Sequence, residues 1–113
     1  MAVGLFAAAA GAGTMKAGKT YGTSLYMSKK FPAFHGKIHS ANPFCIANRP
    51  VRVFRERPGK DKLLGSDRSE DNGRWSVKVN LISGAYYSRA PLYGSASLGI
   101  TCNADRSRLA VVD

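Results

Sequence analysis

The sequence contains few of the residues that bind metals or catalyse reactions. Its 113 residues include two cysteines and two histidines. The cysteines do not form a C-x-x-C pair and only His35 and His39 accompany them, so we predict no metal and no cofactor. A G-x-S-x-G motif, which marks one large class of serine nucleophile, is also absent.

Acidic residues are scarce as well. Seven Asp and Glu stand against 17 Lys and Arg, which gives a formal net charge of +10. Such an excess attracts polyanions, among them nucleic acid, anionic glycopolymers and anionic lipid head groups. A basic surface that only keeps a small domain soluble is the alternative, and charge alone does not decide between them.

Long apolar runs and helical periodicity are missing too. No apolar stretch approaches the roughly 20 residues that cross a bilayer as a helix, so no transmembrane segment is predicted. Apolar residues instead alternate over short stretches, most clearly in FHGKIHS at 34–40, VRVFRER at 51–57 and WSVKV at 75–79. Further short strands are expected at 20–27, 62–66, 85–89, 98–102 and 108–112.

This pattern predicts an all-β fold, a small antiparallel β-sandwich of about seven to eight strands. Turns are expected at 58–61 and at Asn72-Gly73, the strongest two-residue hairpin signal in the chain. The strand at 20–27 is expected at a sheet edge, where pairing with a second copy would give an oligomer. The predicted core consists of Phe34, Ile38, Val51, Val53, Trp75, Val77, Val79, Leu98 and Ile100.

We expect the domain to span residues 19–113. The preceding segment, 1–18, is apolar and rich in Ala and Gly, as in the end of a secretory signal peptide. No basic residue precedes its apolar run, so a complete signal peptide would begin upstream of Met1. A flexible tail is the alternative.

The two cysteines are expected to form one disulfide, Cys45–Cys102. A bridge between positions 57 residues apart would stabilise a thin core by roughly 4 kcal/mol in the chain-entropy model. Such bridges occur in oxidising compartments, which favours a secreted or cell-envelope location. Two unrelated buried thiols of a cytosolic protein are the alternative.

Several motifs together resemble a known family. They are VRVFR at 51–55, GKDKLLGS at 59–66, NGRWSV at 72–77 and GAYY at 84–87. Over about 34–112 the chain resembles the transthyretin-like, or carboxypeptidase-regulatory-like (prealbumin-like), domain of exported bacterial proteins. The resemblance implies an Ig-like/transthyretin-like sandwich. One branch of that group hydrolyses ureides and ends in a Tyr-Arg-Gly-Ser-like tail; this chain ends in RLAVVD, so that activity is not carried over.

The best candidate site is a basic hairpin at 49–62, which would bind a polyanion. Its residues are Arg49, Arg52, Phe54, Arg55, Arg57, Lys60 and Lys62. The basic residues alternate between both faces of the strand, as they also would on an edge strand protected by charge. A second candidate contact is the group Tyr86, Tyr87, Leu92 and Tyr93.

The function expected from these features is that of a secreted or envelope-associated, non-enzymatic module with a structural or adhesive role. Its partner would be another protein. The alternative is binding of an anionic polymer, nucleic acid or cell-wall glycopolymer, through the basic hairpin. A hydrolase using His35 and His39 is a weaker alternative, because on one strand the two histidines lie about 13 Å apart.

Overall fold

The computed structural model describes residues 18–30, 33–79 and 82–113. These residues form an all-β fold with one 3-10 turn and no α-helix. The elements in chain order are β2 (Lys19–Tyr21), β3 (Ser24–Lys30), β4 (Ala33–His39), η2 (Pro43–Cys45), β5 (Pro50–Arg55), β6 (Lys62–Arg68), β7 (Arg74–Lys78), β8 (Gly84–Ala90), β9 (Tyr93–Ser95), β10 (Ile100–Cys102), β11 (Asp105–Arg106) and β12 (Ala110–Val112).

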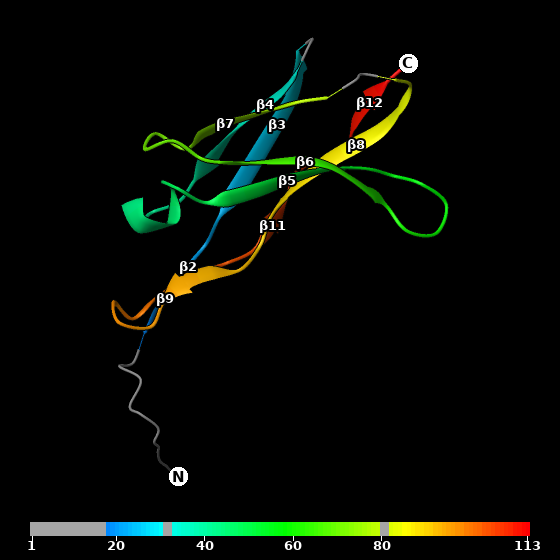
Figure 1. Cartoon of the computed structure of the whole chain (residues 1–113). Coiled ribbons are helices and arrows are strands. Elements are labelled where there is room, and N and C mark those ends of the chain that lie inside the picture. The colour runs from blue at the N-terminus through cyan, green and yellow to red at the C-terminus, as the bar shows by residue number, and fades with distance from the viewer. Residues whose placement is uncertain (1–17, 31–32, 80–81) are drawn as a thin grey trace.

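Two antiparallel sheets pack against each other as the layers of a sandwich (Figure 1). The larger, five-stranded sheet has the order β11-β8-β5-β6, and β12 also pairs with β8. The smaller has the order β3-β4-β7. The prediction of an all-β sandwich is therefore confirmed.

A third sheet, β2-β10-β9, extends one end of the sandwich. Its β2 and β10 run parallel, so the fold is not antiparallel throughout as predicted. The single strand predicted at 20–27 divides into β2 and β3 at Gly22 and Thr23. Each half is the first strand in the order of its own sheet, as the predicted edge position requires.

The core lies between the two larger sheets. Six predicted core residues are buried there: Phe34, Ile38, Val51, Val53, Trp75 and Val77. Val79 packs against this core and is partly buried. The alternation of apolar residues in β4, β5 and β7 thus identified the inward faces of these strands correctly.

Two predicted core positions at the other end of the chain differ. Leu98 is 59% exposed, so its assignment to the core was wrong: strand β10 begins only at Ile100, and Leu98 lies in the preceding turn. Ile100 itself is half-buried in the third sheet. Leu25 and Tyr86 belong to the core instead, with exposures of 5% and 0%.

The Asn72-Gly73 turn forms, but it does not close the predicted hairpin. The amide of Gly73 donates to the Glu70 carbonyl, and Gly73 has φ +89°, which glycine adopts without strain. The strands on either side, β6 and β7, belong to different sheets, so the turn carries the chain from one layer to the other. The predicted turn at 58–61 does close a hairpin, between β5 and β6.

The segment predicted as a signal-peptide remnant or tail, 1–18, lies outside the described residues except for Gly18. Among the described residues there is no helix with the length and hydropathy needed to cross a membrane.

Candidate anion-binding face

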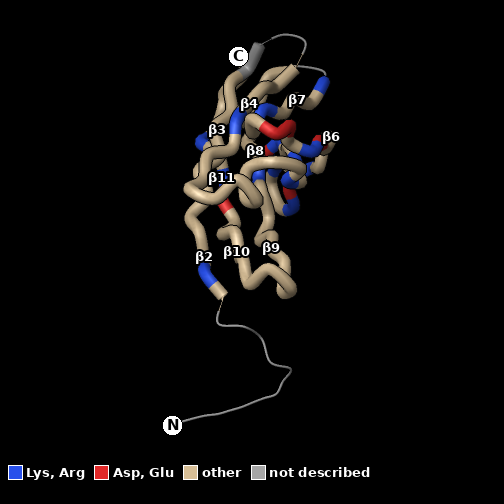
Figure 2. The backbone as a smooth tube through the Cα atoms, turned by 90° about the vertical axis from the view of Figure 1, so that its left-hand side faces the viewer, with Lys and Arg blue, Asp and Glu red and all other residues tan. Residues whose placement is uncertain are grey.

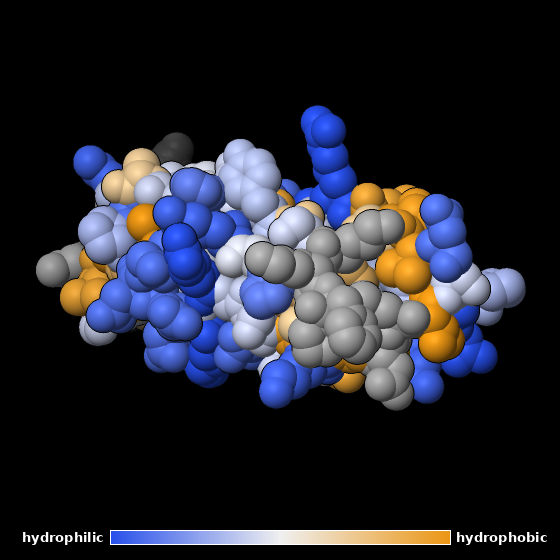
Figure 3. Space-filling view, turned by 90° about the horizontal axis from the view of Figure 1, so that it is seen from above, coloured by the Kyte–Doolittle hydropathy of each residue, from blue (hydrophilic) through white to orange (hydrophobic). Residues whose placement is uncertain are grey.

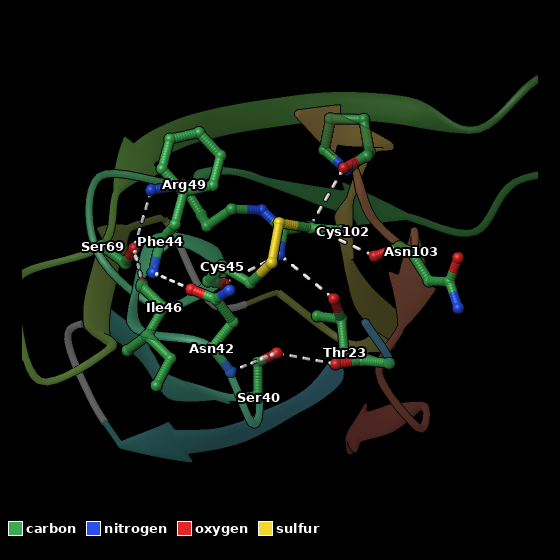
Figure 4. The surroundings of a disulfide bond; sticks show 12 residues. Thr23, Ser40, Asn42, Phe44, Cys45, Ile46, Arg49, Ser69, Cys102 and Asn103 are labelled. Carbon is green, nitrogen blue, oxygen red and sulfur yellow. Dashed lines mark hydrogen bonds between the residues drawn. A yellow bond between two sulfur atoms is a disulfide. The ribbon is translucent and has the colours of Figure 1, made fainter. Parts of the chain in front are cut away.

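The disulfide between Cys45 and Cys102 is present, as predicted. It joins η2 to the end of β10 and so fastens the third sheet to the sandwich (Figure 4). Both cysteines are fully buried.

Arg49 lies beside this disulfide and is not part of a binding surface. Its exposed fraction is 0%, so its assignment to a polyanion site was wrong. The guanidinium donates to Thr23 Oγ1 at 3.1 Å and to the carbonyl oxygens of Cys45 at 2.9 Å, Pro91 at 3.1 Å and Asn103 at 3.3 Å. Burial lowers the pKa of Arg49 from its usual value, and the chain uses this cation to hold segments together.

Arg55 also differs from the predicted arrangement. A bulge after Val53 shifts the register of β5, and the Arg55 guanidinium donates to the Ser83 carbonyl oxygen at 2.8 Å. It covers Gly84, where a Cβ atom would lie 2.7 Å from Arg55 Nε. Of the other predicted cations, Arg52, Arg57, Lys60 and Lys62 are exposed, the last three in or beside the 58–61 turn.

Three arginines from separate strands meet on the outer face of the five-stranded sheet. Arg52 of β5 is the register partner of Arg89 of β8, and Arg89 is the partner of Arg106 of β11. All three are exposed, and we call them the arginine row. Figure 2 shows Lys and Arg positions close together beside β6 and β8. Directly opposed residues in antiparallel strands have Cβ atoms roughly 5 Å apart, so the row starts three cationic side chains from neighbouring positions on one face.

An aromatic pair lies next to the row on the same face. Phe54 and Tyr87 are register partners and stack with ring centroids 5.3 Å apart. The Arg106 guanidinium covers Tyr87 at 3.8 Å from the ring centroid. The Tyr87 hydroxyl donates to Asp61, and Tyr87 is only 5% exposed, so its ring is not free to stack on a ligand.

The Tyr87–Asp61 hydrogen bond shifts the pKa of both side chains. It lowers the pKa of Asp61, with a smaller contribution from the backbone amide of Arg57, and it raises the pKa of Tyr87 above 10.0. Because Asp61 lies in the 58–61 turn, this bond fastens the tip of the β5–β6 hairpin to the sheet.

Carboxylates neutralise only one end of the arginine row. Arg106 forms an ion pair with Glu56 at 3.4 Å, between half-exposed side chains. Within the part of the chain that the structure describes, Arg52 and Arg89 form no ion pair. Two guanidinium groups therefore remain available for anionic groups of a ligand, which Arg can bind through two parallel hydrogen bonds.

The histidines lie on the opposite layer. His35 and His39 are exposed on β4, and the His39 ring meets Tyr26 edge-on at 5.1 Å. No hydrogen bond joins either imidazole to a carboxylate or hydroxyl among the described residues.

The second predicted aromatic group does not form one surface. Tyr86 is buried in the core, and Tyr87 is covered by Arg106. Tyr93 stacks on Phe44 beside the disulfide, while Leu92 is 67% exposed. These residues serve three different parts of the fold.

A comparison of the sequence with models of known families and with curated proteins finds no match.

Proposed function

We propose that this protein is an exported, non-enzymatic β-sandwich module that binds a linear anionic polymer through the arginine row. The observation that carries the proposal is the register Arg52, Arg89, Arg106 across β5, β8 and β11. Sequence reasoning identified Arg52 but missed Arg89 and Arg106, which lie in later strands.

The row is unfavourable for folding alone, which supports a role in binding. Like charges directly opposite each other in a sheet destabilise it by a few tenths of a kcal/mol to about 1 kcal/mol per pair. Arg89 faces such a partner on each side. Arg106 is compensated by Glu56, but no ion pair compensates Arg52 or Arg89 among the described residues. Features that break a local folding rule without such a contact are expected at functional sites, and an anionic ligand would supply the contact there.

The surroundings favour recognition of charged groups over recognition of bases. Single-stranded nucleic acid is normally gripped by free aromatic rings on which the bases stack. Here the Tyr87 ring is already covered by Arg106 and stacked on Phe54, and its hydroxyl is bonded to Asp61. An acidic glycopolymer of the cell surface, recognised by its phosphate, sulfate or carboxylate groups, fits this face best.

The disulfide and the sandwich support the remaining parts of the proposal. The bridge is typical of an oxidising compartment, in agreement with export to the cell envelope. Two packed sheets with a Trp in the core agree with the proposed relationship to transthyretin-like domains. Attachment to an envelope polymer would be the adhesive role of such a module.

The test is affinity for heparin, an anionic glycan, as a function of salt. The variant Arg52→Gln/Arg89→Gln/Arg106→Gln should bind more weakly, and with a shallower salt dependence, than the wild type. The matched control, Arg57→Gln/Lys60→Gln/Lys62→Gln, removes the same charge from the turn region and should bind nearly as well as the wild type. Equal losses in both variants would mean that net charge alone attracts the polymer.

A second titration distinguishes the polymers. For a thymidine oligonucleotide, phosphate contacts from the two unpaired guanidinium groups predict a slope of about −1.4 in log K against log salt, since each contributes roughly −0.7. Heparin should bind at least as tightly as the oligonucleotide at equal charge. Strong preference for the oligonucleotide would contradict the glycopolymer assignment.

A further inference from the structure

We propose that the outer face of the β3-β4-β7 sheet is a second polyanion-binding surface, so that one molecule bridges two polymer chains. This inference rests on the function proposed above, because it assigns a second contact to the same class of ligand. It is carried by a different set of residues.

A row of polar and basic residues crosses all three strands of this sheet. Lys37 of β4 is the register partner of Tyr26 on β3 and of Arg74 on β7. Together with Ser28 and His35 they line a shallow hollow of about 410 Å³. We call these five residues the β4 groove. It offers two cations and three further polar side chains around a depression wide enough for an anionic group.

Nothing on this sheet neutralises the groove. Strands β3, β4 and β7 contain no Asp or Glu. Lys37 and Arg74 are exposed, as is Lys78 four residues further along β7, and none of them forms an ion pair within the described ranges. Two carboxylates from outside the sheet contact its backbone: Asp105 accepts from the Leu25 amide at 2.8 Å, and Asp67 accepts from the Ser76 amide at 2.9 Å. Neither forms an ion pair with a cation of this face among the described residues, whereas Glu56 pairs with Arg106 in the arginine row.

The two basic surfaces face away from each other. Inward residues of β4 and β5, such as Phe34 and Val53, fill the core between the layers, so Lys37 and Arg52 project from opposite sides of the sandwich. In the view of Figure 3, hydrophilic residues cover a broad part of the surface and the larger hydrophobic patches gather toward one end.

One polymer chain cannot lie flat on both surfaces. The turn at 72–73 joins the layers on one side, and on the other the Leu25 amide donates to Asp105 at 2.8 Å, which joins β3 to β11. A ligand that reached both surfaces would have to bend around one of these closed edges. Two separate chains can each bind one surface, and a bivalent module then links them.

The experiment measures bridging directly. Biotinylated heparin is fixed on streptavidin beads, the protein is added, and capture of fluorescent heparin from solution is recorded. Analytical ultracentrifugation of the same samples without heparin determines whether the protein is a monomer. This control is needed because a dimer could bridge two polymers with one surface per subunit.

Wild-type protein should capture fluorescent heparin. Lys37→Gln/Arg74→Gln/Lys78→Gln should bind the beads but capture at least tenfold less of the second polymer, as should the variant lacking the arginine row. The variant Arg57→Gln/Lys60→Gln/Lys62→Gln has the same net charge as both and should bridge as the wild type does. Cooperative thermal unfolding of all three variants, at or above the wild-type temperature, establishes that the fold is retained.

The outcomes separate the two proposals. If the Lys37→Gln/Arg74→Gln/Lys78→Gln variant captured as much fluorescent heparin as the wild type, the proposal of a second surface would be overturned. The proposal for the arginine row would stand. If the arginine-row variant bound the beads and captured the second polymer as well as the wild type does, the function proposed above would be overturned. A dimer in the ultracentrifuge whose bridging survives loss of the groove would also overturn the inference.

Discussion

At the scale of single residues, arginines only a few positions apart have unrelated roles. Arg49 is buried among carbonyl oxygens, Arg52 projects from the sheet and Arg55 covers Gly84. Sequence alternation predicts which side of a strand a residue occupies, but it does not show whether a long polar side chain returns to the interior. Arg49 lies before β5, outside the alternating stretch, so the sequence pattern does not distinguish this buried arginine from its exposed neighbours.

We predict that Arg49→Met lowers the free energy of unfolding by at least about 3 kcal/mol, since each buried acceptor left unpaired costs roughly 1–3 kcal/mol. Arg49→Lys should recover only part of this, because one ammonium cannot reproduce the fork that reaches Thr23 and three carbonyls. Urea unfolding of each variant measures the effect. Arg57→Met, at an exposed position beside the 58–61 turn, is the control and should stay within about 0.5 kcal/mol of the wild type; equal losses at both positions would contradict a structural role for Arg49.

We predict that the Tyr87–Asp61 bond makes stability depend on pH at both extremes. The lowered pKa of Asp61 means that its contribution is present above the ordinary value near 3.8 and is lost as the pH falls through the lowered value. The raised pKa of Tyr87 means that its contribution is present below 10.0 and is lost as the pH rises through the raised value. The difference in stability between the wild type and Tyr87→Phe should therefore be constant between about pH 5 and 9 and shrink outside that range. Tyr26→Phe, at an exposed position, should show no such profile in the same unfolding series.

At the scale of elements, strands with regular alternation were predictable and the pairing between strands was not. The inward faces of β4, β5 and β7 followed from local sequence. The short strands β9 and β11 were missed, because two or three residues carry no period. The arginine row depends on the register of β11 with β8 and of β8 with β5, which no local pattern contains. Of the arginine row, local sequence therefore predicted only Arg52; Phe54 and Tyr87 beside it were predicted as parts of two separate candidate contacts.

We predict that reduction of Cys45–Cys102 loosens the third sheet before the sandwich. The bridge joins η2 to β10, whereas the core residues of β4 and β5 lie between the two larger sheets. Loss of the bridge should reduce the unfolding free energy by roughly 4 kcal/mol. Hydrogen exchange should then show amides of β9 and β10 losing protection earlier than those of β4 and β5. Cys45→Ala/Cys102→Ala should behave as the reduced protein does; uniform loss of protection in all strands would contradict this local role.

At the scale of the whole molecule, the net charge is +10, and exposed cations lie on both outer faces of the sandwich. Concentrated like charge keeps copies of the protein apart and destabilises the compact state, while it raises the rate at which polyanions are encountered. Stability and binding should therefore respond to salt in opposite directions. Salt screens the repulsion within the protein, and it also weakens the attraction of the polymer.

We predict that raising NaCl from about 20 mM to about 500 mM stabilises the free protein while it releases heparin, since the Debye length falls below the spacing of exposed charges. Arg89 is the position at which the two effects meet, because it has a cationic register partner on each side. Arg89→Gln should stabilise the protein by up to about 1 kcal/mol at low salt and by much less at high salt. The same substitution should weaken heparin binding. Arg57→Gln removes one charge from the turn without relieving an opposed pair, so it should leave stability nearly unchanged at both salt concentrations. If Arg89→Gln destabilised the protein at low salt, the arginine row would contribute to folding stability. The main support for its role in binding would then be lost.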